Sequence, residues 1–128
     1  MTDKITRSMT ASTPDGLQVV VADNIDVEAV DKIEATIPKN SVPTAVNLHP
    51  LLVGVQFITI TATTYEDLTF KVGDGDPVTL DRALILMGKG LVALLGASTS
   101  TITFTNASAL VDNEVSIMVG RDAIIPGN

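Results

Sequence analysis

The chain has 128 residues, a formal net charge of −7 and no cysteine, so neither disulfides nor thiolate metal sites are available to it. An acidic surface repels nucleic-acid phosphates and anionic lipid headgroups, so neither nucleic acid nor a membrane is an expected partner. The length predicts a single domain, and because only 3% of the residues are aromatic, the core is expected to consist of Val, Ile, Leu and Ala.

The N-terminal segment Met1 to Gly16 is polar, rich in Ser and Thr, and ends in the turn signature Pro14-Asp15-Gly16. Lys4 and Arg7 lead into the polar run T-A-S-T-P-D-G, so the segment is not expected to be a signal peptide. We expect an N-terminal arm at 1–16, a β-sandwich domain at 17–121 and a C-terminal tail at 122–128.

The next two segments are both compatible with strands. Leu17 to Ala22 is short and rich in β-branched residues, which predicts a strand. Ile25 to Ile33 also fits a helix, since Ala29, Val30 and Ile33 match the helical period. We favour a strand there, because residues 32–37 continue with apolar side chains at alternate positions.

The most apolar strand is expected at Leu51 to Ala62, after a shorter one at Thr44 to Leu48 that ends before Pro50. In the longer strand the apolar residues occupy odd positions up to Phe57 and even positions from Ile58 onward. This slip in phase predicts either a β-bulge or burial of the strand on both faces.

A hairpin is predicted where the alternating residues Leu68, Phe70 and Val72 meet the turn G-D-G-D-P and a short return strand at 78–80. Beyond it, Ala83 to Met87 and Leu91 to Leu95 are apolar on both faces, and Gly88-Lys89-Gly90 separates them.

The last segment, Thr99 to Arg121, predicts two alternating strands joined by a polar turn at Asn106-Ala107-Ser108. Short strands separated by Gly, Pro and Asn at roughly ten-residue spacing predict an all-β fold. We expect a single jelly-roll or β-sandwich of about eight strands with an extended N-terminal arm. An immunoglobulin-like strand order remains the alternative.

No catalytic or cofactor motif is found, so no enzyme activity, cofactor or metal is expected. His49 is the only histidine and has no neighbouring nucleophile or orienting carboxylate, so it is interpreted as a turn residue. Four aspartates offer oxygens to Ca²⁺ but lack the ligand spacing of a calcium loop, so turn roles are expected for them. These aspartates are Asp67, Asp74, Asp76 and Asp81.

Two further patterns have a structural and a chemical interpretation. Glu66-Asp67 and Asp112 with Glu114 could act as glycosidase carboxylates, but the shortage of aromatic platforms favours solvated strand ends. Asn106-Ala107-Ser108 fits the glycosylation pattern and equally fits a turn, in which Asn tolerates left-handed geometry and Ser caps backbone groups.

One resemblance goes beyond these patterns. The strand I-T-F-T-N-A-S followed by E-V-S-I-M-V-G resembles the C-terminal hairpin of the small jelly-roll decoration (cement) proteins of tailed bacteriophages. I-P-K-N-S with the strand after it, and Lys71-Val72-Gly73 with its turn, are similar to earlier parts of the same pattern. The similarity covers roughly Ile33 to Gly120 and leaves out the N-terminal arm.

The resemblance implies a non-enzymatic virion protein on the capsid exterior, which stabilises the shell by bridging subunits of the major capsid protein. It also implies a homodimer or homotrimer, joined through uncharged sheet surfaces. The residues expected at that oligomer interface are Val53, Val55, Phe57, Leu84, Leu86, Val92 and Leu94. The arm would contact the capsid through Ile5, Arg7 and Met9.

Two other functions remain open at this point. One is a tail, head-fibre or spike-base protein of a phage. The other is a carbohydrate-binding β-sandwich module, against which the low aromatic content argues.

Overall fold

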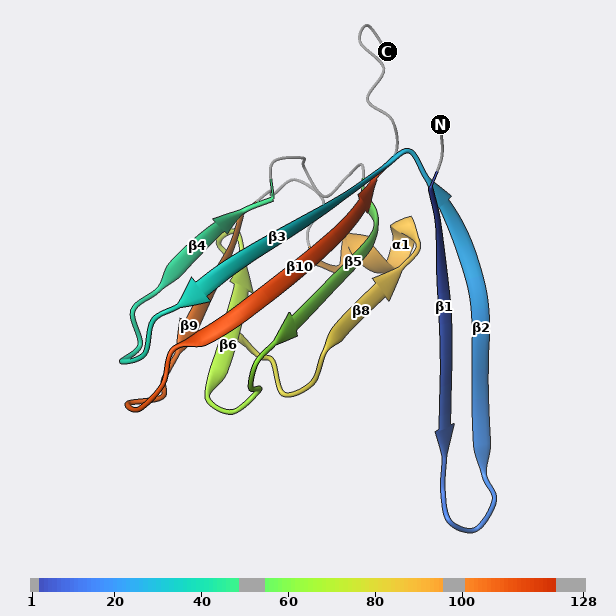
Figure 1. Cartoon of the computed structure of the whole chain (residues 1–128), viewed down its shortest axis with the longest axis horizontal. Coiled ribbons are helices and arrows are strands. Elements are labelled where there is room, and N and C mark those ends of the chain that lie inside the picture. Colours follow the sequence, from blue (N-terminus) through green and yellow to red (C-terminus); the bar gives the residue numbers. More distant parts are fainter. Residues whose placement is uncertain (1–2, 49–54, 96–100, 122–128) are drawn as a thin grey trace, which may run out of the picture.

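The computed structural model describes residues 3–48, 55–95 and 101–121. These residues form an all-β fold of three antiparallel sheets, which confirms the predicted fold class at that level (Figure 1). The strands are β1 (Asp3–Ser12), β2 (Gln18–Val27), β3 (Ala29–Ile37), β4 (Thr44–Asn47), β5 (Val55–Ala62), β6 (Leu68–Val72), β7 (Val78–Thr79), β8 (Leu84–Met87), β9 (Thr101–Asn106) and β10 (Asn113–Arg121). The short helix α1 (Lys89–Val92) and the 3₁₀ turn η2 (Ala93–Leu95) follow β8.

The body of the molecule is a β-sandwich of two four-stranded sheets, ordered β3-β10-β5-β8 and β4-β9-β6-β7. The pairing of its eight strands is nested, because the first pairs with the last (β3 with β10) and the second with the seventh (β4 with β9). The third pairs with the sixth (β5 with β8), and the two middle strands β6 and β7 form the predicted hairpin. Consecutive strands from β3 to β10 therefore alternate between the two sheets, except that β6 and β7 lie in the same sheet.

The core lies between these two sheets and consists almost entirely of aliphatic side chains. Alternation places every second residue of a strand on the inner face, as in β9, where Ile102 and Phe104 are buried and the threonines between them are partly exposed. The fully buried residues include Ile37, Ile58, Ile60, Leu68, Ile102, Phe104, Val115, Ile117 and Val119. Phe70 and Phe104, which are paired in the β6–β9 ladder, have tilted rings with centroids 6.4 Å apart.

The N-terminal segment is a long β-hairpin that projects from the sandwich (Figure 1). The expected boundary between arm and domain at Gly16 falls instead on the turn of this hairpin, where Gly16 has a φ of 96° and its N–H donates to Thr13 O. The predicted strand at 17–22 is present, but it pairs with β1 and not with a sandwich strand. The segment Ile25 to Ile33 is extended, as the favoured prediction has it. It is interrupted at Glu28, where the chain passes from the hairpin to the sandwich.

The predicted C-terminal hairpin is wrong in its pairing, although both of its strands exist. β9 pairs with β4 and β6, whereas β10 pairs with β3 and β5, so the two strands lie in opposite sheets. Alternation predicts which face of a strand is buried but carries no information about its neighbour. The segment 107–112 is therefore a crossing between sheets.

The phase slip in β5 has both of the predicted causes. Gly120 of β10 is opposite Phe57 and Arg121 is opposite Val55, so Gln56 is an extra residue in the ladder and forms a bulge. Phe57 is buried on the outer face of its sheet, and Ile58 is buried in the core.

The apolar segment 91–95 is helical, because Gly88, with a φ of 108°, turns the chain out of β8. The N–H of Val92 then donates to Gly88 O at 3.0 Å, and Val92 is buried. His49 and Val53 lie outside the described residues.

Candidate interaction surfaces

The acidic turns do not assemble into a metal site. In the ranges 3–48, 55–95 and 101–121, no group of three or more His, Asp or Glu side chains has metal-ligating spacing. Asp67 has a φ of 60°, and its carbonyl accepts a hydrogen bond from Ala107 N. The carboxylate of Asp112 accepts one from Lys39 N at 3.0 Å. Both residues therefore have positions in turns.

Two buried asparagines hold the loops at one end of the sandwich. Asn106 Nδ2 donates to Val111 O at 2.9 Å and to Ile37 O at 3.4 Å, and its Oδ1 accepts from Ser108 N. Asn113 Nδ2 donates to Thr64 O at 2.7 Å. Asn106 is thus the last residue of β9, and it holds the turn that follows through its side chain and not through left-handed geometry, since its φ is not positive. Ser108 Oγ caps the backbone as predicted, by accepting from Leu110 N and Val111 N.

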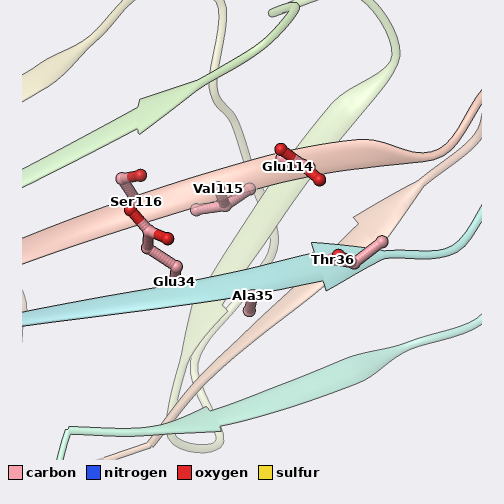
Figure 2. A pocket seen from close by; sticks show the side chains of 6 residues that line it. All are labelled: Glu34, Ala35, Thr36, Glu114, Val115 and Ser116. Atoms are coloured by element: carbon pink, nitrogen blue, oxygen red, sulfur yellow. The ribbon is translucent and has the colours of Figure 1, made fainter.

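A shallow hollow of about 190 Å³ lies between β3 and β10 (Figure 2). Figure 2 shows that Glu34, Glu114 and Ser116 surround it on the outer face of the sheet, without a histidine, lysine or arginine among the residues that line it. It offers two carboxylates and the hydroxyls of Thr36 and Ser116 but no nucleophile with a partner base, and the part of the fold that surrounds it is a regular strand pair.

The N-terminal hairpin has two different faces. Directly paired residues of an antiparallel ladder share a face, so the apolar face of the hairpin follows from the register. Its pairs are Ile5/Ile25, Arg7/Asp23, Met9/Val21 and Ala11/Val19. The opposite, polar face has Lys4/Asp26, Thr6/Asn24, Ser8/Ala22, Thr10/Val20 and Ser12/Gln18.

The base of the apolar face packs on the outer surface of the sheet β3-β10-β5-β8. A Cβ atom at position 120 would lie 2.7 Å from Ile5 Cδ1, 3.2 Å from Val27 Cγ1 and 3.3 Å from Phe57 Cβ. Glycine at position 120 is what lets the hairpin approach the sheet this closely. Val27 and Phe57, which lie at this contact, are both buried.

The one charged pair on the apolar face is neutralised within the hairpin. Arg7 Nε and Nη2 donate to the two carboxylate oxygens of Asp23 at 2.9 and 2.7 Å, a bidentate arrangement. These hydrogen bonds lower the pKa of Asp23 and raise the pKa of Arg7. At the turn, the hydroxyl of Thr13 donates to the Asp15 carboxylate and lowers the pKa of Asp15.

An apolar groove of about 390 Å³ lies at the open edge of the sandwich, between the β6–β7 hairpin and β8 with η2. Three of the seven residues expected at an oligomer interface line it: Leu84, Leu86 and Leu94. The prediction is wrong for Val55 and Val92, which are buried in the core of their own subunit. It is also wrong for Phe57, which the hairpin of its own chain covers.

The outer face of the sheet β4-β9-β6-β7 carries an array of threonines, which we call the threonine face. Register places Thr105, Thr69 and Thr79 in one cross-strand row and Thr103 beside Lys71 in the next. Together with Thr101, these residues give a hydroxyl-rich surface on which Lys71 is the charged side chain of the strands. Part of it borders a hollow of about 430 Å³.

The arm residues expected to contact a capsid are only partly free to do so. Ile5 lies against Gly120, and Arg7 is bound to Asp23, whereas Met9 is exposed.

Sequence reasoning missed the threonine face, although the T-I-T-F-T alternation in β9 carries its signal. It also missed the docking of the hairpin, for which the sequence signal is Gly120, a glycine inside strand β10.

Within the described part of the chain, no helix is long and apolar enough to cross a membrane. No protein-family model, no curated protein and no solved structure matches the chain, so its surfaces and its strand order are the basis on which its function is inferred.

Proposed function

We propose that this chain is a non-enzymatic structural protein of a bacteriophage virion that decorates the capsid and stabilises it by bridging subunits of the major capsid protein. The observation that carries the proposal is the nested strand order of the sandwich, β3-β10-β5-β8 against β4-β9-β6-β7. The proposal includes the jelly-roll topology, in which a chain folded in half pairs its first strand with its last. Jelly rolls of eight strands recur in viral capsid proteins and in lectins.

The surfaces of the molecule support binding to a large partner. The threonine face is nearly uncharged and built on paired strands, whereas the chain as a whole has a net charge of −7. Such a face can be desolvated against a protein at low electrostatic cost, and its hydroxyls can exchange hydrogen bonds with the partner. We assign the capsid contact to this face in place of the N-terminal arm.

Decoration does not require a tight single contact. A shell presents many equivalent sites, and a protein that touches two neighbouring subunits gains from the effective concentration of the second contact. A contact area near the standard of about 800 Å² per partner would hold each copy in place.

Banding in a density gradient tests the proposal. In virus particles purified from the source of this chain, we expect the chain to band with the virions, in a fixed ratio to the major shell protein. A few copies per particle would favour the tail or fibre role instead. If the chain remains at the top of the gradient with free proteins, the virion proposal is wrong, and binding to carbohydrate arrays is the next assay.

A further inference from the structure

We propose that the distal part of the hairpin's apolar face is covered by a second copy of this chain, which makes the hairpin the contact through which copies associate. The proposal does not depend on the capsid role. It rests on three observations. One face of the hairpin is apolar and the other polar, the sandwich covers only the base of the apolar face, and the uncovered part of that face has no net charge.

The cover supplied by the same chain ends near the base of the hairpin. Along the apolar face, exposure rises from 1% at Val27 to 53% at Met9 and 60% at Val19, with Ile5, Ile25 and Val21 between these limits. The strands extend about 33 Å from base to tip, and Figure 1 shows the tip standing clear of the sandwich. An isolated two-stranded hairpin is at best marginally stable in water, so this part of the ribbon needs a cover.

The distribution of charge favours the same hairpin face of a second copy as the surface that covers it. Copies of a chain with a net charge of −7 repel one another over most of their surface. The apolar face of the hairpin is different, because beyond its base the only charged side chains on it, Arg7 and Asp23, bind each other. Two such faces can therefore approach without net repulsion and without stranding an unpaired charge.

Two exposed apolar side chains also lie on the outer face of the sheet near the base of the hairpin, in a row that begins with Lys32. On the outer face of the sheet, Gly120 and Phe57 lie against the base of the hairpin, and Met87 in the same row is also buried. In the row beside it, Met118 and Ile85, which flank Thr59, remain 37% and 49% exposed. We call Met118 and Ile85 the sheet patch.

Area decides how these surfaces combine. One face of a ribbon about 33 Å long and roughly 10 Å wide offers on the order of 330 Å². A stable interface buries about 800 Å² per partner, so hairpin faces alone fall short. A symmetric exchange, in which each copy contributes the uncovered part of its hairpin face and its sheet patch, enlarges the contact but leaves it below that size, so we expect a reversible, concentration-dependent association. Such an interface is the same on both copies, as closed symmetry requires.

Val19 and Val20 give a matched pair of variants. They are adjacent in β2, are both valine and are both 60% exposed, but they point to opposite faces of the hairpin. We expect light scattering to find the wild type as an oligomer at micromolar concentration. Val19→Glu should raise its dissociation constant at least tenfold, and Val20→Glu should change it less than twofold.

Labelling offers a test that does not disrupt the interface. Because the chain has no cysteine, Val19→Cys and Val20→Cys each introduce a single thiol for maleimide. With rising protein concentration, labelling at position 19 should slow severalfold, while labelling at position 20 should not.

Three results would overturn the proposal: a wild type that is monomeric at 100-fold higher concentration, equal effects of the two glutamates, or concentration-independent labelling at position 19. If the wild type is monomeric and Val19→Glu abolishes binding to virus particles, the hairpin instead contacts the shell. If the wild type is oligomeric as described but does not bind particles, the capsid proposal fails and this one stands.

Discussion

At the scale of single residues, the side-chain hydrogen bonds of two buried asparagines hold the loops at one end of the sandwich. Asn106 lies on β9 and donates to carbonyls of Ile37 and Val111, so it links the end of β3 in one sheet to β9 in the other and to the crossing segment. Asn113 does the same for the loop after β5, by exchanging hydrogen bonds with the backbone of Thr64. No buried side-chain polar atom of the described residues lacks a partner. Such fully satisfied groups fix the loop geometry, which apolar packing alone does not specify.

Removing the amide of Asn106 should therefore be costly. Asn106→Ala leaves two carbonyls and one N–H without their partner in a buried site, for which we expect a loss of about 2–4 kcal/mol in the free energy of unfolding. Urea denaturation measures this loss. Asn24→Ala, an exposed position on the polar face of the hairpin, is the control and should stay within about 0.5 kcal/mol. A loss at Asn106 as small as the control would contradict the structural role.

At the scale of elements, the hairpin is attached to the sandwich at one narrow place. Its base meets the sheet where Gly120 leaves room for Ile5 and Val27, and the chain then enters β3 after Glu28, whose N–H donates to Arg121 O at 2.9 Å. The hairpin and the sandwich can therefore respond separately to a change at this contact.

Gly120→Ala should loosen the hairpin without unfolding the sandwich. The new methyl group would press on Ile5, Val27 and Phe57, and overpacking of this kind costs about 1–3 kcal/mol. We expect hydrogen exchange to speed up in β1 and β2 and to remain slow in β9 and β10. Gly90→Ala, which has open space around it, is the matched control. If Ile5→Ala fails to relieve the effect of Gly120→Ala, the contact is not its cause.

Acid should loosen the hairpin as well. The hydrogen bonds from Arg7 hold the pKa of Asp23 below its unfolded value of about 3.9. The stabilisation is therefore complete above that unfolded value and is lost as the pH falls through the lower pKa of the folded hairpin. We expect hairpin amides followed by NMR to lose protection below about pH 4. Asp23→Asn should remove the part of this transition that the ion pair carries, and an unchanged transition in that variant would assign it to other groups such as Asp15.

At the scale of the whole molecule, the sequence predicts strands better than it predicts their neighbours. Alternation placed Ile102 and Phe104 on a buried face, and the glycine-rich turn placed the β6–β7 hairpin. Pairing of β10 with β3 and β5 is not encoded locally, because it depends on how the chain folds in half. For this reason the sequence of the C-terminal segment predicts a hairpin, whereas in the structure the segment crosses between the two sheets.

The sequence predicts the composition of the interaction surfaces, but it does not predict which residues form them or where they lie. The segments predicted to be most apolar do supply apolar surface, but Val55 and Val92 are buried in their own subunit, while Leu94 remains exposed. The two faces of the hairpin depend on its register, and the threonine face depends on three strands being neighbours in one sheet. Each of these is a long-range property of the fold.

Rebinding to depleted particles tests most directly whether the threonine face bridges a shell. Thr103 lies in the middle of β9 on that face, and Ser116 lies in the middle of β10 on the outer face of the opposite sheet; both are half-buried. We predict that wild type and Ser116→Arg rebind to the same occupancy, and that Thr103→Arg binds at least tenfold more weakly while still associating with itself. Rebinding of Thr103→Arg at wild-type strength would contradict the account.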